Sequence, residues 1–169
     1  VLDAIESGGL TPDDAEWLPV ATTGSYGRDA KLKLGEGDNQ VSLDGRFARN
    51  VALYTGDGID SITVAASLRI GRDGMMRLGG GDDSLSFEGF VGRNFRLGTG
   101  AGNDQVDLLA GSKILRDARL GLGDGDDSLS HEGQVKRWMV VSGGEGIDTF
   151  VDLGGLPKKP ILQSIEILA

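Results

Sequence analysis

The chain repeats one short motif six times: two glycines followed by an acidic or amide residue, which we call the anchor. The anchors lie alternately 21 and 23 residues apart, so the full period is 44 residues. The six anchors are Asn39, Asp60, Asp83, Asp104, Asp127 and Asp148. Glycine stands four and two residues before each anchor, at Gly35, Gly37, Gly56, Gly58, Gly79, Gly81, Gly100, Gly102, Gly123, Gly125, Gly144 and Gly146. Such a period indicates repeat units that bury their apolar faces by stacking on one another.

Apolar residues recur at fixed offsets from the anchors. Two residues after each anchor come Val41, Ile62, Leu85, Val106, Leu129 and Phe150. Seven residues before it come Leu32, Leu53, Met76, Leu97, Leu120 and Val141, and thirteen before it come Tyr26, Phe47, Ile70, Val91, Ile114 and Val135. These positions fit the inward faces of short strands separated by Gly-marked corners, with no room for a crossover helix. The sequence therefore predicts an all-β fold, a parallel β-solenoid of the β-roll or right-handed β-helix kind.

The predicted solenoid has six to seven coils over residues 21–153 and forms a single domain with its two caps. Residues 1–20 have helix-like apolar spacing with a start signal at Thr11-Pro12, so we expect a short N-terminal helical cap. Residues 154–169 are expected to form a C-terminal capping strand. Caps are needed because open strand edges at the ends of a solenoid invite aggregation.

The charge balance narrows the range of partners. The chain has 17 basic and 26 acidic residues, a formal net charge of −9, and no cysteine. A net acidic chain is a poor match for the phosphates of nucleic acid, and cations or basic partners suit it better. Without cysteine, disulfides and thiolate metal sites are excluded. No apolar run is long enough to span a membrane.

The anchors predict a cation site along one edge. Stacked coils would place the anchor carboxylates in a column at strand spacing, where neighbouring charges repel by about 0.9 kcal/mol even in water. Glycines that accept positive φ would let carbonyl groups turn toward the same edge. Calcium tolerates an irregular shell of carboxylate and carbonyl oxygens, whereas magnesium demands stricter geometry. The alternative is that Asp and Asn cap tight turns through their own backbone hydrogen bonds.

The motifs "GEGDNQVSL", "GDGIDSITV", "GGGDDSLSF", "GAGNDQVDL", "GDGDDSLSH" and "GGEGIDTFV" resemble the calcium-binding repeats of RTX, or haemolysin-type, secreted proteins. The resemblance covers about residues 28 to 153. It implies calcium held between successive coils by the anchor side chains and the paired-glycine carbonyls, with Asn39 the weaker ligand. RTX motifs follow one another in tandem, whereas this chain has one motif per longer coil, so only one edge would bind calcium.

A second column consists of arginines, one of which lies eleven residues before every anchor. These are Arg28, Arg49, Arg72, Arg93, Arg116 and Arg137. As a ligand-binding ladder they would dock an acidic polymer, because guanidinium forks match carboxylate, sulfate or phosphate groups. The alternative is a structural corner in which each arginine bonds turn carbonyls and pairs with a neighbouring aspartate. The constant offset of eleven residues confines the variation in coil length to the opposite segment.

These features predict a non-enzymatic module, because no interruption of the repeat would build a catalytic cleft. His131, the single histidine, fills a slot occupied elsewhere by Leu43, Val64, Phe87 and Leu108, which predicts a packing role. We expect a secreted or cell-surface module that binds calcium and acts as a rigid structural or adhesive segment. The alternative is an acidic-polysaccharide-binding module appended to an enzyme. Besides calcium, the expected partner is an acidic polysaccharide or a cell-surface molecule. A third interpretation is a right-handed β-helix enzyme that acts on acidic sugars.

Overall fold

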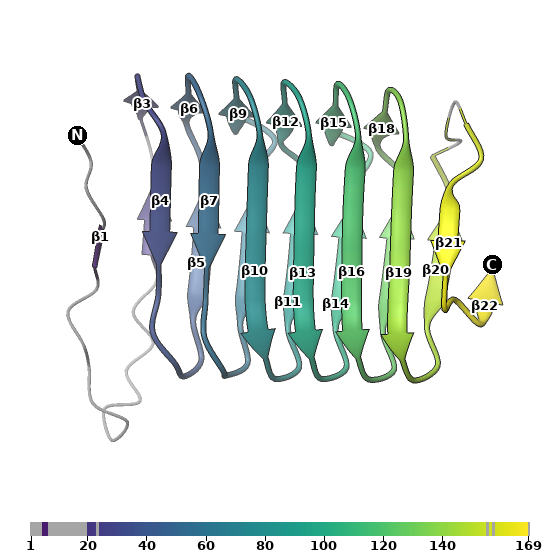
Figure 1. Ribbon diagram of the computed structural model, residues 1–169. Helices are drawn as coiled ribbons and strands as arrows, with labels where there is room; N and C mark the ends of the chain where they lie inside the picture. The colour runs from purple at the N-terminus through teal and green to yellow at the C-terminus, as the bar shows by residue number, and fades with distance from the viewer. Residues whose placement is uncertain (1–4, 7–19, 23, 155, 157, 169) are drawn as a thin grey trace.

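The computed structural model describes residues 5–6, 20–22, 24–154, 156 and 158–168, and these form a parallel β-solenoid of about seven turns. Every strand pairing within the described residues is parallel, and each coil contributes one strand to each sheet along most of the stack (Figure 1). The all-β solenoid expected from the repeat is thus confirmed. The described residues contain no helix, and therefore none that could cross a membrane.

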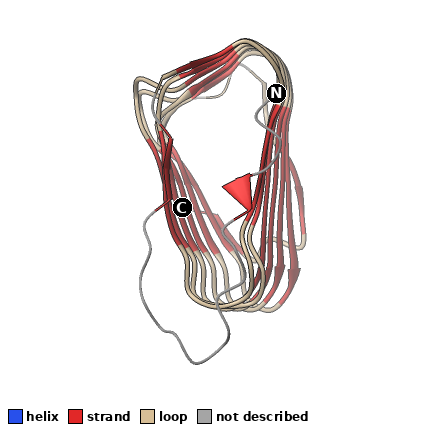
Figure 2. Cartoon of the chain, turned by 90° about the vertical axis from the view of Figure 1, so that its left-hand side faces the viewer, coloured by secondary structure: helices blue, strands red, loops and turns tan. Residues whose placement is uncertain are grey.

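Three sheets form the walls of the solenoid (Figure 2). The first sheet contains β1 (Ile5–Glu6), β4 (Ala30–Lys33), β7 (Val51–Tyr54), β10 (Gly74–Gly80), β13 (Phe95–Ala101), β16 (Ala118–Asp124), β19 (Met139–Glu145) and β21 (Ile161–Gln163). The second contains β2 (Val20–Thr22), β5 (Gln40–Leu43), β8 (Ser61–Val64), β11 (Ser84–Phe87), β14 (Gln105–Leu108), β17 (Ser128–His131), β20 (Thr149–Asp152) and β22 (Ile167–Leu168). The third contains β3 (Ser25–Tyr26), β6 (Arg46–Phe47), β9 (Arg69–Ile70), β12 (Phe90–Val91), β15 (Lys113–Ile114) and β18 (Gln134–Val135).

The apolar columns predicted from the repeat form the core. In the second sheet Leu85 is in register with Ile62 on one side and Val106 on the other. In the first sheet Met76 is likewise in register with Leu53 and Leu97. The predicted inward residues are buried in one continuous apolar cluster, against which Tyr26 packs partly buried. Like residues stack because parallel strands in register place equivalent positions of successive coils side by side.

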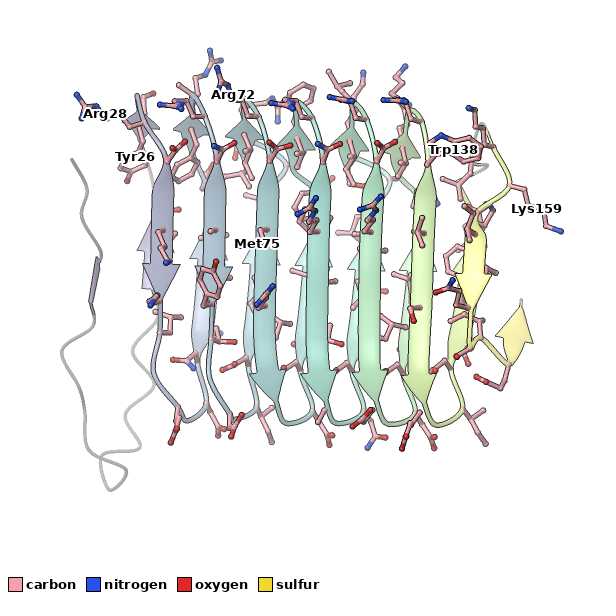
Figure 3. All side chains as sticks on the ribbon, in the orientation of Figure 1. Tyr26, Arg28, Arg72, Met75, Trp138 and Lys159 are labelled. Carbon is pink, nitrogen blue, oxygen red and sulfur yellow. The ribbon has the colours of Figure 1, made fainter. Side chains whose placement is uncertain are left out.

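Two edges of the solenoid carry the polar columns. The Gly-Asp turns connect the first sheet to the second and line the lower edge in Figure 1, while the arginine corners connect the third sheet to the first. Arg28 and Arg72 mark the arginine edge at the opposite side of the molecule (Figure 3). The longer coils gain their extra residues between the second and third sheets. There the backbone makes tight turns closed by the Leu68 N–H to the Ala65 carbonyl and the Ser112 N–H to the Leu109 carbonyl.

The helical cap expected at the N-terminus stays a prediction, whereas most of the C-terminal segment belongs to the described residues. The helix expected within residues 1–20 lies almost wholly outside the described residues; of that segment, Ile5–Glu6 form β1, which pairs with β4. The C-terminal segment, expected as one strand, forms the two short strands β21 and β22. They extend the first and second sheets respectively, because a bend at Ser164, with a φ of 50°, redirects the chain.

Candidate functional site

The Gly-Asp edge is built on glycines that stack directly on one another. The second glycine of every motif has a positive φ, from 92° to 148°. At Gly100, whose φ is 124°, an added Cβ would lie 1.6 Å from the carbonyl oxygen of Gly79 on the preceding coil. The glycines are therefore required for two reasons. They supply a backbone conformation that L-residues avoid, and they let the carbonyl of one coil lie against the Cα of the next.

The anchors form a single file joined by hydrogen bonds. The backbone N–H of Asp60 donates to Oδ1 of Asp83 at 2.8 Å, and the N–H of Asp83 donates to Oδ1 of Asp104 at 2.8 Å. The same bond links Asp104 to Asp127 and Asp127 to Asp148. Each carboxylate thus satisfies a turn amide of the preceding coil, which is a structural function of the kind expected from turn-capping residues, here between coils rather than within one turn.

A different residue type completes the hydrogen bonds at each end of this column. At the start, the side-chain amide of Asn39 donates to the carbonyls of Gly35 at 3.3 Å and Gly37 at 2.6 Å, and to Oδ1 of Asp60 at 2.8 Å. At the end, the N–H of Asp148 donates to Oε2 of Glu166 at 2.9 Å. Glu166 was not among the predicted site residues, because it follows Asp148 by 18 residues rather than by 21 or 23. Glu166 stands two residues before Leu168, just as the anchor Asp148 stands two residues before Phe150. Leu168 and Phe150 are register partners, which identifies Glu166 as a seventh anchor.

The second oxygen of each anchor carboxylate is left without a partner. The five anchor aspartates are at most 2 % exposed, and Oδ2 of each is buried with no hydrogen bond in the structure. Burial raises the pKa of Asp83 to about 7 and that of Asp127 to about 6. It also raises the pKa values of the other three anchor aspartates. A buried charge of this kind requires neutralisation, either by a proton or by a cation.

At two of the anchors a neighbouring threonine opposes the effect of burial on the pKa. A threonine, Thr55 or Thr99, stands five residues before Asp60 or Asp104, and its hydroxyl lowers a pKa that burial has raised. That hydroxyl donates to a leucine carbonyl of the next coil, so Oδ2 of the anchor still lacks a partner. Before Asp83 and Asp127 the equivalent residue is a leucine, which offers no such dipole.

Two further columns, in which aspartate recurs every 44 residues, run beside the anchors and beside the arginines. One precedes the anchors directly: the N–H of Ile59 donates to Asp38 and that of Asn103 donates to Asp82. The other follows the arginines; there the N–H of Asn50 donates to Oδ1 of Asp29. In both columns aspartate alternates with a neutral residue, so exposed like charges lie two coils apart. The repeat made these columns visible in the sequence, but their hydrogen bonds depend on the stacking.

The predicted arginine column lies at one corner of the solenoid. Every second arginine in it forms an ion pair. Arg49, Arg93 and Arg137 approach the aspartate of the preceding coil, at 3.5, 3.8 and 3.9 Å respectively. The carboxylates concerned belong to Asp29, Asp73 and Asp117. Arg28, Arg72 and Arg116 make no ion pair with any described residue. Three of the six arginines are thus without an ion pair among the described residues, and the corner keeps part of its positive charge.

His131 lies in the core column at the predicted slot. Its side chain is fully buried, and Nδ1 lies 2.8 Å from Oδ1 of Asp152 on the following coil. The backbone registers of the two residues match, which brings the imidazole and the carboxylate together. The pairing was not expected, because Asp152 replaces an apolar residue at the same offset.

Among the described residues, no three acidic or histidine side chains converge in a way that could hold a metal by themselves. Any cation at the Gly-Asp edge would therefore need backbone carbonyl oxygens as well as anchor carboxylates. Compared with known protein families, with curated proteins and with solved structures, the chain gave no match. The geometry of the Gly-Asp edge and the charges around it are the features of the chain that bear on its function.

Proposed function

We propose that the chain is a rigid structural or adhesive module, acting outside the cell, whose Gly-Asp edge binds calcium. The observation that carries the proposal is the file of five buried carboxylates, each with an Oδ2 atom that has no partner. These oxygens lie one coil apart, at about 4.8 Å, along a wall of stacked glycines. Charge that is buried and uncompensated at regular intervals is what a bound cation would offset.

The donor set suits calcium better than a transition metal. It consists of carboxylate oxygens and backbone carbonyls, without any cysteine or histidine at this edge. Calcium accepts six to eight oxygen ligands in a flexible arrangement. Asp60, Asp83, Asp104, Asp127 and Asp148 would supply carboxylate oxygens, the paired glycines would supply carbonyls, and Asn39 would close the first coil. The ion would supply positive charge between neighbouring anchors.

Rigidity follows from the continuous walls of the solenoid. The first and second sheets each run unbroken through eight strands, and one apolar cluster fills the space between the walls. Units of this kind are stabilised by contacts with their nearest neighbours, so a ligand that ties adjacent coils together stabilises the whole stack. Extracellular calcium is abundant enough to occupy modest sites, which supports a role on the cell surface or in secretion.

Calcium is expected to raise the melting temperature at pH 8. Sites with dissociation constants of about 10⁻⁴ to 10⁻³ M would each add roughly 0.4 to 1.4 kcal/mol at about 1 mM ion. Summed over the inter-coil sites, this stabilisation corresponds to a shift of about 5 °C or more for a domain of this size. Circular dichroism melts in chelator and in calcium measure it directly.

Magnesium at the same concentration is the control, and it should give a clearly smaller shift because it demands stricter geometry. Equal melting temperatures in chelator and in millimolar calcium at pH 8 would show that the edge holds no ion. The file of aspartates would then be a purely structural device, in which the Oδ1 of each accepts the backbone N–H of the preceding anchor.

A further inference from the structure

On the outer face of the first sheet, two adjacent coils each carry a second arginine. Three residues after each arginine of the corner column stands an outward residue of the first sheet, and these residues are Lys31, Ala52, Met75, Arg96, Arg119 and Val140. Only where Arg93 and Arg116 form the corner is that residue also an arginine. The stacking does not require this second arginine, because the other four coils stack without it.

The four arginines surround one recess. Arg93, Arg96, Arg116 and Arg119 line a hollow of about 210 Å³ together with Asn94, Phe95 and Asp117. Arg96 belongs to β13 and Arg119 to β16, and the two residues are direct register partners. Further along the same strands the outward positions are Gly98 and Gly121, beside which a Cβ would meet no atom closer than 4.0 Å. The surface next to the arginine pair is therefore open.

The positive charge of the recess is largely unpaired. Asp117, the one acid that lines it, is already approached by Arg137 at 3.9 Å, and Arg93 lies 3.8 Å from Asp73. Arg96, Arg116 and Arg119 make no ion pair with any residue that the structure describes. Like charges directly opposite each other on paired strands are destabilising. A chain of net charge −9 nevertheless concentrates four arginines here, which points to an anion that offsets them.

We propose that this recess binds a doubly charged oxyanion, phosphate or sulfate, either free or carried on a larger molecule. Guanidinium groups present parallel N–H donors that match the oxygens of such ions two at a time. Arg96 and Arg119 hold the ion from adjacent strands, while Arg93 and Arg116 approach it from the corner. The recess exceeds the size of one ion, so part of the carrier also fits. This site is independent of calcium binding at the opposite edge of the first sheet.

Calorimetric titration with inorganic phosphate and with inorganic sulfate, in low-chloride buffer at pH 8, tests the site. Both ions are expected to bind the wild-type chain, and the double variant Arg96→Ala with Arg119→Ala should bind at least about tenfold more weakly. Both side chains are exposed, so the fold should be retained, as circular dichroism would verify. A second double variant, Arg96→Lys with Arg119→Lys, keeps the charge but lacks the paired N–H donors of the guanidinium group. It should also bind both ions more weakly than the wild-type chain.

The matched control is Arg49→Ala with Arg72→Ala. It removes two arginines from the same corner in adjacent coils, where Ala52 and Met75 replace the second arginine. Its affinity should stay within about twofold of wild type. Equal losses in the control and in the Arg96/Arg119 alanine variant, wild-type affinity in the lysine variant, or no binding of either ion would each overturn the proposal.

A heparin fragment in the same titration distinguishes the two sources of the ion. If the fragment binds more tightly than sulfate, and the Arg96/Arg119 alanine variant loses that gain, the oxyanion is carried on a glycan. If the fragment binds no better than sulfate, the site takes the free ion. Tighter fragment binding that persists in the alanine variant would place the glycan elsewhere and contradict the site for that ligand.

Discussion

Replacing Gly100 with alanine is expected to destabilise the solenoid by about 3 to 5 kcal/mol, the sum of a strained backbone conformation and overpacking. The new Cβ would lie 1.6 Å from the Gly79 carbonyl oxygen, and the φ of 124° disfavours any L side chain. Because the obstructing atom belongs to the backbone of the preceding coil, the two coils would have to separate. A fall in the melting temperature of roughly 10 °C would register this loss.

Gly98→Ala is the control within the same strand. Gly98 faces outward with no atom within 4 Å of its added Cβ, and its φ is not positive. Alanine there should leave the stability unchanged or raise it by about 0.4 to 1 kcal/mol, since it restricts the unfolded chain. Similar losses for Gly98→Ala and Gly100→Ala would mean that coil stacking does not depend on the motif glycines.

Without calcium, the solenoid is expected to become less stable as the pH rises from about 4 to about 7. The pKa of Asp83 is raised by burial from 3.8 to about 7 and that of Asp127 to about 6, so in this interval the folded chain binds more protons than the unfolded chain. Stability is then present at acidic pH and is lost as the pH passes the folded-state pKa values. Each such carboxylate contributes at most about 1.4 kcal/mol per pH unit.

The measurement is a series of thermal melts in chelator between pH 4 and pH 8, with the double variant Asp83→Asn and Asp127→Asn as control. Asparagine keeps the oxygen that accepts the N–H of the preceding anchor, as Asn39 shows that an amide fits this column. Asparagine cannot titrate, so the melting temperature of the variant should fall less steeply with pH. At the most sensitive pH the slope should be smaller by about 3 °C per pH unit for each carboxylate replaced. A wild-type profile that matches the variant would contradict the raised pKa values.

The stabilisation by calcium and the loss of stability with rising pH involve the same carboxylates. Its stabilisation should grow with pH, because protons and calcium compete for the same Oδ2 oxygens. At pH 5 Asp83 and Asp127, with pKa values of about 7 and about 6, would already be protonated and would gain little from the ion. A calcium effect of equal size at pH 5 and pH 8 would place the binding at other residues.

The repeat alone was sufficient to predict the stacking of the coils and the core, but not whether two or three sheets form the walls. Fixed offsets from the anchors identified the inward columns, such as Val41 to Phe150, because stacked parallel strands place equivalent positions in contact. The C-terminal end was harder to predict. Glu166 breaks the spacing and is recognisable as an anchor only when β22 pairs with β20.

The sequence by itself determined which residues share a column, because periodicity is a property of the chain and survives without coordinates. Only the tertiary structure decided what each column does. It showed that Oδ1 of every anchor aspartate accepts an amide of the preceding coil while Oδ2 stays buried without a partner, and that Arg96 and Arg119 meet beside the corner arginines. Burial, hydrogen-bond direction and the convergence of side chains from different coils depend on three-dimensional packing, which spacing along one chain does not specify.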